Sequence, residues 1–447
     1  MVTVEQQSQP RDCKVLWQAI VQAAIYTSVA SMSPSGASSR CQYALLVLVS
    51  GGLEELAVHY IRQMDIKMEV EILWALTQGK ACGGAASMGK ILVKVSTLED
   101  VRRFTRECRV AQTILALLTY DLDVPDMSPK KIEEIMYEQS QWSSAEEIVG
   151  IDGEGVHAFR ASCVRDGRHD FKSYDVMRTM GHAVLTRHPT WTVSLGYSEV
   201  EYVSIVFDRS VFIGIAVGKP QRGSLARPEK ADFNVVPYCD YMSRDLQLGS
   251  VPHCTKMRPS VALLLLLFAT DGNPMRGNML DIMGGLATIP IEAATNFTNV
   301  HALSGDINRA TTSQAIKNCQ LARSHLAEGS SVHARDWDAA HLDTLVDEDS
   351  VDWIVTDMPF GNRTELKKAD MARVLRAVSM VLKPETGRCV LLSKGYKRLD
   401  TAAAGVDGLC LLERRMVIIG GFVCYLSKYW RPGEVSESTT AGDSDTA

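Results

Sequence analysis

The sequence has no marked excess of positive charge. Its 447 residues include 47 Lys and Arg against 53 Asp and Glu, which gives a net charge of −6 and a pI of about 6.0. Proteins that bind polyanions over their whole surface are basic. Composition therefore excludes that class and leaves a local basic patch as the only way for this chain to bind nucleic acid.

Paired cysteine motifs are also missing. The 11 cysteines are scattered, odd in number and without a C-x-x-C pair. This pattern argues against a disulfide framework and a self-contained zinc finger, and it favours a reducing compartment such as the cytoplasm, with the nucleus also open. Cys239, His253 and Cys254 could be drawn as a metal site, but their spacing fits no ordinary zinc module, so we expect no metal.

No apolar run is long enough to cross a membrane. The richest run, residues 261–269, has about half the length that a membrane-spanning helix needs, and we predict a buried helix there. Residues 15–31 are also apolar, but Glu5 precedes them and a clear cleavage site is missing. We therefore expect neither a targeting segment nor a membrane partner.

Composition and pattern divide the chain into five parts. Two α+β units precede a long stretch in which helices and strands alternate, and both ends read as poorly ordered. The predicted parts are an N-terminal extension (1–40), a first α+β unit with an acidic linker over 120–150 (41–150), a second unit (151–225), an α/β domain (226–434) and an acidic tail (435–447). The strand and helix spacing of the α/β domain predicts a doubly wound parallel sheet.

Acidic residues stand at the ends of successive strands in that domain. Asp281 ends the first strand, Asp306 the second, Asp338 or else Asp336 follows the third, and Asp357 ends the fourth. Any one of them could simply cap the next helix. Four in strand order favour a ligand site instead.

The turn after Asp281 contains glycines but matches neither common phosphate-binding motif. It departs from G-x-G-x-x-G, and no lysine follows the glycines as a P-loop requires. A glycine turn with a strand-end carboxylate about 20 residues later suits a nucleoside cofactor without a pyrophosphate.

The stretch Asp357-Met358-Pro359-Phe360-Gly361 is the most specific motif. Proline cannot donate to a sheet ladder, so a strand must stop here, and a Phe that merely packs into the core is the structural alternative. The motif resembles the (Asp/Asn/Ser)-Pro-Pro-(Tyr/Phe) turn of S-adenosylmethionine-dependent amino-methyltransferases. Together with IPIEAA and RRMVIIGGFVCYLSKY, DMPFGNR resembles the THUMP-containing guanine-N2 methyltransferases of tRNA over about residues 41–430.

This resemblance implies a Rossmann-like class I methyltransferase domain after a ferredoxin-like unit and a THUMP-like RNA-binding unit. It implies that Asp357 and the carbonyl of Met358 accept hydrogen bonds from the guanine amino group, with Pro359 shaping the turn and Phe360 stacking on the base. The implied cofactor residues are Asp281, Met283, Gly284, Gly285 and Ala287 in the loop, Asp306 at the ribose, Asp338 near the adenine, and Arg258 and Ser260 at the methionine end. Glu292 reads as structural.

The sequence departs from the family pattern at two positions. Ala287 stands at the second glycine of the cofactor turn, and Ile282 stands where a proline usually follows the acid. Glycine is required there only if φ is positive or the ligand touches the backbone. The departure leaves open a binding protein that kept its RNA unit but lost catalysis.

A cluster of cations in the second unit is the candidate RNA-binding patch. We predict RNA contact by Arg160, Arg165, Arg168 and Lys172, with His169 and Arg178 nearby. The resemblance also implies tRNA as the substrate and a small zinc-ribbon activator protein as a partner. The alternatives are guanine-N2 methylation of another RNA such as a small nuclear RNA, and a protein-glutamine methyltransferase, for which the second unit has no use.

Overall fold

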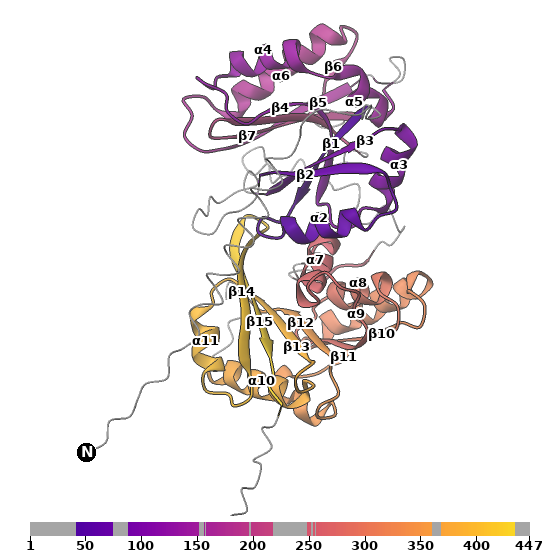
Figure 1. Ribbon diagram of the computed structural model, residues 1–447, viewed down its shortest axis with the longest axis vertical. Coiled ribbons are helices and arrows are strands. Elements are labelled where there is room, and N and C mark those ends of the chain that lie inside the picture. Colours follow the sequence, from indigo (N-terminus) through magenta and orange to yellow (C-terminus); the bar gives the residue numbers. More distant parts are fainter. Residues whose placement is uncertain are drawn as a thin grey trace, which may run out of the picture. The chain divides into compact units, whose positions relative to one another are not determined.

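The computed structural model describes residues 42–74, 88–151, 156, 158–195, 198–217, 248–251, 254, 256–359 and 368–433. These residues form two β-sheets with helices packed on them (Figure 1). Within this part of the chain, no helix is long and apolar enough to cross a membrane. The same residues contain no group of His, Cys, Asp and Glu suited to a metal ion.

The first α+β unit has a ferredoxin-like arrangement. Its elements are β1 (Tyr43–Val49), α2 (Glu54–Arg62), β2 (Met68–Trp74), β3 (Gly89–Val95), α3 (Leu98–Glu107) and β4 (Thr113–Asp121). The strands pair antiparallel in the order β2-β3-β1-β4. Alternation explains the sheet, because the odd residues of β1 from Leu45 to Val49 face the helices while Leu46 and Leu48 face the other side.

The second unit continues the same sheet. Its elements are α4 (Pro129–Gln139), α5 (Trp142–Val149), β5 (Ala158–Asp166), α6 (Ser173–Arg187), β6 (Thr192–Val193), β7 (Val200–Phe207) and β8 (Ser210–Ala216). Because β8 pairs with β4, one eight-stranded sheet runs through both predicted units in the order β2-β3-β1-β4-β8-β7-β5-β6.

The structure differs from the expected acidic linker over 120–150. Two helices, α4 and α5, occupy most of that segment, and α4 packs against α6. Ser128 accepts a hydrogen bond from the N–H of Lys131 at 3.2 Å and Pro129 follows it, which is a standard helix start. The acidic composition hid this signal.

The third part contains the second sheet. Its elements are α7 (Pro259–Ala269), β9 (Gly277–Asp281), α8 (Thr288–Asn296), β10 (Val300–Asp306), α9 (Arg309–Ala322), η3 (Arg323–His325), β11 (Ser331–Asp336), η4 (Ala339–Thr344), β12 (Trp353–Asp357), α10 (Lys368–Val381), β13 (Arg388–Ser393), α11 (Lys397–Ala403), β14 (Cys410–Ile419) and β15 (Phe422–Trp430). The strand order is β11-β10-β9-β12-β13-β15-β14. The first five strands are parallel as predicted, and the hairpin β14–β15 adds two antiparallel strands at the edge.

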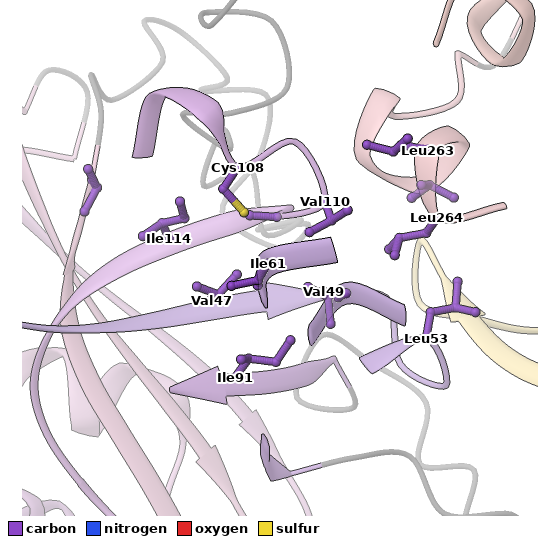
Figure 2. Packing of buried hydrophobic residues seen from close by; sticks show 14 of the residues in the cluster. Val47, Val49, Leu53, Ile61, Ile91, Cys108, Val110, Ile114, Leu263 and Leu264 are labelled. Atoms are coloured by element: carbon purple, nitrogen blue, oxygen red, sulfur yellow. The ribbon is translucent and has the colours of Figure 1, made fainter. Parts of the chain in front are cut away.

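The Leu-rich run predicted as a buried helix is α7, and all of its residues are buried. Its Leu263 and Leu264 belong to the same apolar cluster as Val49, Leu53 and Ile61 of the first unit (Figure 2). Burial of each leucine side chain contributes about 1.5–3 kcal/mol. A helix that is apolar on every side is stable only when other elements cover it on every side, which explains its central place in the core.

Candidate active site

The ends of β9 and β12 define the site. Starting from β9, the chain runs outward in one direction through β10 and β11 and in the other through β12 and β13. In open parallel sheets of this kind, ligands bind at the carboxyl ends of the strands where the order reverses. The carboxylates of Asp281 and Asp357 stand at those two strand ends, and Asp306 ends the neighbouring β10.

Asp281 is buried and is held by uncharged groups. The hydroxyl of Thr356 donates to its Oδ1 at 2.6 Å, and the N–H of Met283 donates to the same oxygen at 3.4 Å. Burial raises the pKa of Asp281 to about 7, against the lowering effect of the Thr356 hydrogen bond, and the charges of Asp357 and Asp306 raise it further. Asp357 and Asp306 therefore both lie close enough to Asp281 to act on it.

The loop after Asp281 is built around Asp306. The N–H of Gly285 donates to Asp306 Oδ2 at 3.1 Å, and the N–H of Gly284 donates to the carbonyl of Gly305 at 2.8 Å. A Cβ at Gly284 would come within 2.0 Å of Ser304 Oγ, so only glycine fits there. The glycine turn and Asp306 are therefore held together in the fold.

Ala287 adopts a conformation that favours glycine. It has φ 66° and ψ 28°, in the left-handed region, and it is the N-cap residue of α8. A non-glycine residue there costs roughly 1–2 kcal/mol. The backbone therefore keeps the turn in spite of the substitution noted in the sequence.

Asp357 is the least satisfied acid of the site. Among the described residues, its Oδ1 is buried and has no hydrogen-bond partner. Burial raises the pKa of Asp357 to about 7. The next residue, Met358, is buried and donates its N–H to the carbonyl of Leu392 at 2.9 Å, which fixes the turn to β13, while Pro359 is exposed. Phe360 lies outside the described residues.

The other predicted cofactor residues lie after strand β11 and at the start of helix α7. Asp338 is exposed and its Oδ1 accepts from the N–H of Ala340 at 3.0 Å, so it caps the short helix η4, and Asp336 ends β11. Arg258 is the N-cap residue of α7, and Ser260 is fully buried in the first turn of that helix. Glu292 is buried in α8 and accepts from Asn296, as expected of a structural residue.

Three residues that sequence reasoning missed hold the loop in place. Thr356 bonds both Asp281 and the N–H of Met283. Asn318 of α9 is fully buried and donates to the carbonyl of Leu286 at 3.0 Å. Trp337 donates its indole N–H to the carbonyl of Ile282 at 3.0 Å. Only Thr356 had a local signal, since it directly precedes Asp357 in the strand.

The predicted RNA patch is divided by the sheet. Arg160 lies 3.6 Å from Glu201 Oε1 and on the face of β5 opposite to Arg165, because residues five apart in a strand point to opposite sides. Arg165 contacts His169, which reaches the carbonyl of Asp208 at 2.7 Å. The exposed cations Arg168, Lys172 and Arg178 lie in the turn and helix that follow β5.

The geometry suits a cofactor with hydroxyls and a positive charge. Three carboxylates at adjoining strand ends attract a cation and accept hydrogen bonds from sugar hydroxyls. Glycine at 284 lets the loop backbone pass close to Ser304 and leaves the loop tight. The buried oxygen of Asp357, which has no partner among the described residues, would accept from a bound amino group.

Comparison with known proteins agrees with this geometry. Residues 251–421 match the UPF0020 family, an RMKL-like methyltransferase domain. The tRNA (guanine(6)-N(2))-methyltransferase THUMP3 of Bos taurus is 30% identical over 266 residues, which are 57% of this chain and 47% of that protein. A U6 snRNA (guanine-N(2))-methyltransferase, THUMPD2 of Bos taurus, is 30% identical over 120 residues, or 27% of this chain and 23% of that protein. The matched regions thus span about half or less of these relatives.

The fold is also similar to solved structures. TrmN from Thermus thermophilus superimposes with a TM-score of 0.60 at 22% identity, over 87% of this chain and 99% of that one. The resemblance and the Rossmann-like class I methyltransferase fold predicted from the sequence are confirmed. The sequence similarity to a methyltransferase domain extends over residues 251–421.

Proposed function

We propose that this protein transfers the methyl group of S-adenosylmethionine to the N2 amino group of a guanosine in the acceptor-stem region of tRNA. One observation carries the proposal: the buried, unpartnered Oδ1 of Asp357 stands where the strand order reverses, next to the loop held by Asp306. The similarity to a tRNA guanine-N2 methyltransferase supports the choice of substrate.

S-adenosylmethionine, when bound, supplies an electrophilic methyl group on a positively charged sulfonium. Asp306 would accept from the ribose hydroxyls, while the loop that includes Asp281, Gly285 and Ala287 would pass beneath them. Asp338 would lie toward the adenine, and the start of α7 with Arg258 and Ser260 would cover the methionine end. The negative charge of the three acids favours the sulfonium over an uncharged ligand.

Guanine N2 is a poor nucleophile because its lone pair is delocalised into the ring. Asp357 Oδ1 and the carbonyl of Met358 would accept its two hydrogens and orient the nitrogen, and Phe360 would stack on the base, a contact worth about 1–3 kcal/mol. Orientation of this kind can contribute roughly 7–11 kcal/mol to lowering the barrier. With a pKa near 7, Asp357 is suited to receive the proton that N2 loses.

The second unit would dock the tRNA as a THUMP-like domain. Arg168 and Lys172 are exposed, and Arg165 contacts His169, which lies between them in the sequence. Such cations hold RNA through its phosphates and read shape, which leaves the choice of nucleotide to the active site. Arg160, paired with Glu201 on the other face, is the weakest member of the predicted set.

A small zinc-ribbon activator protein is the proposed partner. The helix α9, which packs on the edge strand β11, carries the exposed apolar side chains of Ile316 and Leu321. Exposed apolar patches and unpaired strand edges are common partner sites. The chain expressed without the activator should be poorly soluble and weakly active, and a monodisperse, fully active chain would contradict the partner proposal.

A second candidate is guanine-N2 methylation of a small nuclear RNA, favoured by the shorter match to a U6 snRNA enzyme. We place the tRNA activity in the cytoplasm, with the nucleus as the location for this alternative. Mass spectrometry of nucleosides from separated tRNA and small nuclear RNA, in cells with and without the protein, distinguishes the two. Loss of N2-methylguanosine from tRNA supports the first proposal, loss from small nuclear RNA the second, and no change in either contradicts both.

A further inference from the structure

A basic and aromatic surface lies at the carboxyl edge of the second sheet, near Asp357. It is separate from the loop after Asp281 and from the basic patch of the second unit. It consists of Lys394, Lys397 and Phe422, and we call it the hairpin-rim surface. Lys394 and Lys397 are exposed in the segment that follows β13, and the ring of Phe422, at the start of β15, is 52% exposed. An exposed phenylalanine beside a cation has no evident role in the core.

The register of the sheet places this surface beside Asp357. Asp357 of β12 lies opposite Leu392 of β13, and Ser393 lies opposite Tyr425 of the antiparallel β15. Phe422, three residues before Tyr425, therefore extends past the carboxyl end of β13, at the same edge as Asp357. Lys394 Nζ is 5.2 Å from the centroid of the Phe422 ring.

Electrostatics supports this placement. Burial raises the pKa of the Cys424 thiol to about 12, Asp357 raises it further, and Lys394 lowers it, so both charges lie near the same sulfur. Asp400, the acid nearest in sequence to Lys397, is bonded to Arg414 at 2.9 Å and is not available to neutralise the lysines.

The segment that carries the lysines is held firmly. Tyr396, between them, packs edge-on against Tyr425 with ring centroids 4.8 Å apart. Arg414 lies over the ring of Tyr396, 4.6 Å from its centroid. A fixed backbone presents the two ammonium groups and the Phe422 ring as one surface rather than as independent mobile side chains.

We infer that the hairpin-rim surface binds the RNA strand next to the target guanosine, with Lys394 and Lys397 on its phosphates and Phe422 stacked on a neighbouring base. A nucleotide must leave its stack to reach Asp357, and the bases beside it then need new stacking partners. Cations together with an exposed aromatic ring form the usual contact surface for single-stranded RNA. The inference rests on the proposed function, because it assumes an RNA substrate.

The test compares tRNA binding and methylation by full-length wild type, the double variant Lys394→Gln/Lys397→Gln, and Phe422→Leu, with the activator present throughout. Lys67→Gln, an exposed lysine of the first unit, is the matched control. The double variant should make the slope of log K against log salt shallower by about 1.4, since each single-strand phosphate contact contributes about 0.7. Phe422→Leu should weaken binding about tenfold with an unchanged slope.

Affinity for S-adenosylmethionine and the control variant should remain at wild-type values. Unchanged affinity and slope in both surface variants would overturn the inference. Wild type that binds tRNA but transfers no methyl group would contradict the proposed function alone, and the slope would still decide the role of this surface. Wild type that binds no RNA at all would contradict both.

Discussion

Two carboxylates near the first sheet and two in the second sheet have different kinds of partner. In the first sheet, Glu146 contacts Arg187 at 3.2 Å and His188 at 2.8 Å, and Glu201 accepts from Ser162 and lies near Arg160. In the second sheet, Asp281 has only uncharged donors, and one oxygen of Asp357 has none among the described residues.

This difference separates structural acids from acids kept for a ligand. A buried carboxylate beside a cation has its charge balanced within the fold, and removing the cation is costly. A buried carboxylate without a cation carries a raised pKa, as Asp281 and Asp357 do, and its desolvation is offset only when a ligand arrives. Of these four acids, Asp281 and Asp357 are the two at the strand ends of the candidate site, and their pKa values are raised.

Replacement of Asp357 should have the largest effect on methyl transfer. Asp357→Ala should lower methyl transfer by about 10²–10⁴-fold, because the acceptor matters more in the transition state than in docking. Binding of tRNA and cofactor should persist in calorimetry. Asp357→Asn should keep a trace of activity if orientation dominates and none if proton acceptance does, while Asp347→Ala, an exposed acid, serves as control. If Asp357→Ala methylates tRNA at the wild-type rate, the DMPFG motif only ends the strand and has no catalytic role.

The acid that holds the loop should control cofactor affinity. Asp306→Ala removes the acceptor for the N–H of Gly285 and for the proposed ribose hydroxyls, so we expect the Kd for S-adenosylmethionine to rise about 10- to 100-fold. Asp306→Asn keeps one oxygen and should recover part of the loss. Equal affinity of wild type and both variants in titration calorimetry would remove Asp306 from the site.

The division of the basic patch can be tested directly. Arg165→Gln, Arg168→Gln and Lys172→Gln together should flatten the salt dependence of tRNA binding by roughly 2–3 in slope, because duplex phosphate contacts contribute about 0.9 each. Arg160→Gln alone should leave the slope unchanged, since Arg160 faces Glu201. If Arg160→Gln alone flattens the slope by about 0.9, Arg160 also contacts a phosphate, and the two faces of β5 do not separate RNA contact from structure.

The smallest predicted effect is on stability, and it has opposite signs in the two sheets. The pKa of Asp357 is raised from 3.8 to about 7, so the native state keeps a proton that the unfolded state releases, and stability falls as pH rises through that window. Asp357→Asn removes this penalty and should raise Tm at pH 8, by about 2–4 °C for each 1 kcal/mol regained, but not at pH 4.

The matched variant in the first sheet is Glu146→Gln, which should lower Tm at pH 8 because it leaves Arg187 and His188 without their carboxylate. Differential scanning calorimetry at the two pH values measures both variants. A loss of Tm at pH 8 for Asp357→Asn would mean that its charge is balanced in the fold after all.

Local patterns in the sequence were enough to predict much of the second sheet. The alternation of strands and helices, the strand ends at Asp281, Asp306 and Asp357, and the buried helix α7 all follow from periodicity and from proline and glycine. The hydrogen bonds of Asn318 and Trp337 to the loop could not be predicted, because they join residues 32 and 55 positions apart.

Two further features of the structure differ from the sequence predictions, although each had a local signal in the sequence. Ser128-Pro129 marked the start of α4 inside an acidic segment. The five-residue spacing of Arg160 and Arg165 already placed them on opposite faces of a strand, which a count of cations per segment does not register. The pairing of β4 with β8 had no such signal, since strand neighbours far apart in sequence are set by the whole sheet.

That pairing has a consequence for how the chain can be cut. A fragment that ended before β5 would lack β8 and would expose the edge of β4, a nine-residue strand in which Leu115 and Leu117 are buried. Long, apolar, uncovered edges recruit strands from other molecules. During synthesis the same edge stays open until about 95 further residues have been added, so the first unit is most exposed to aggregation in that interval.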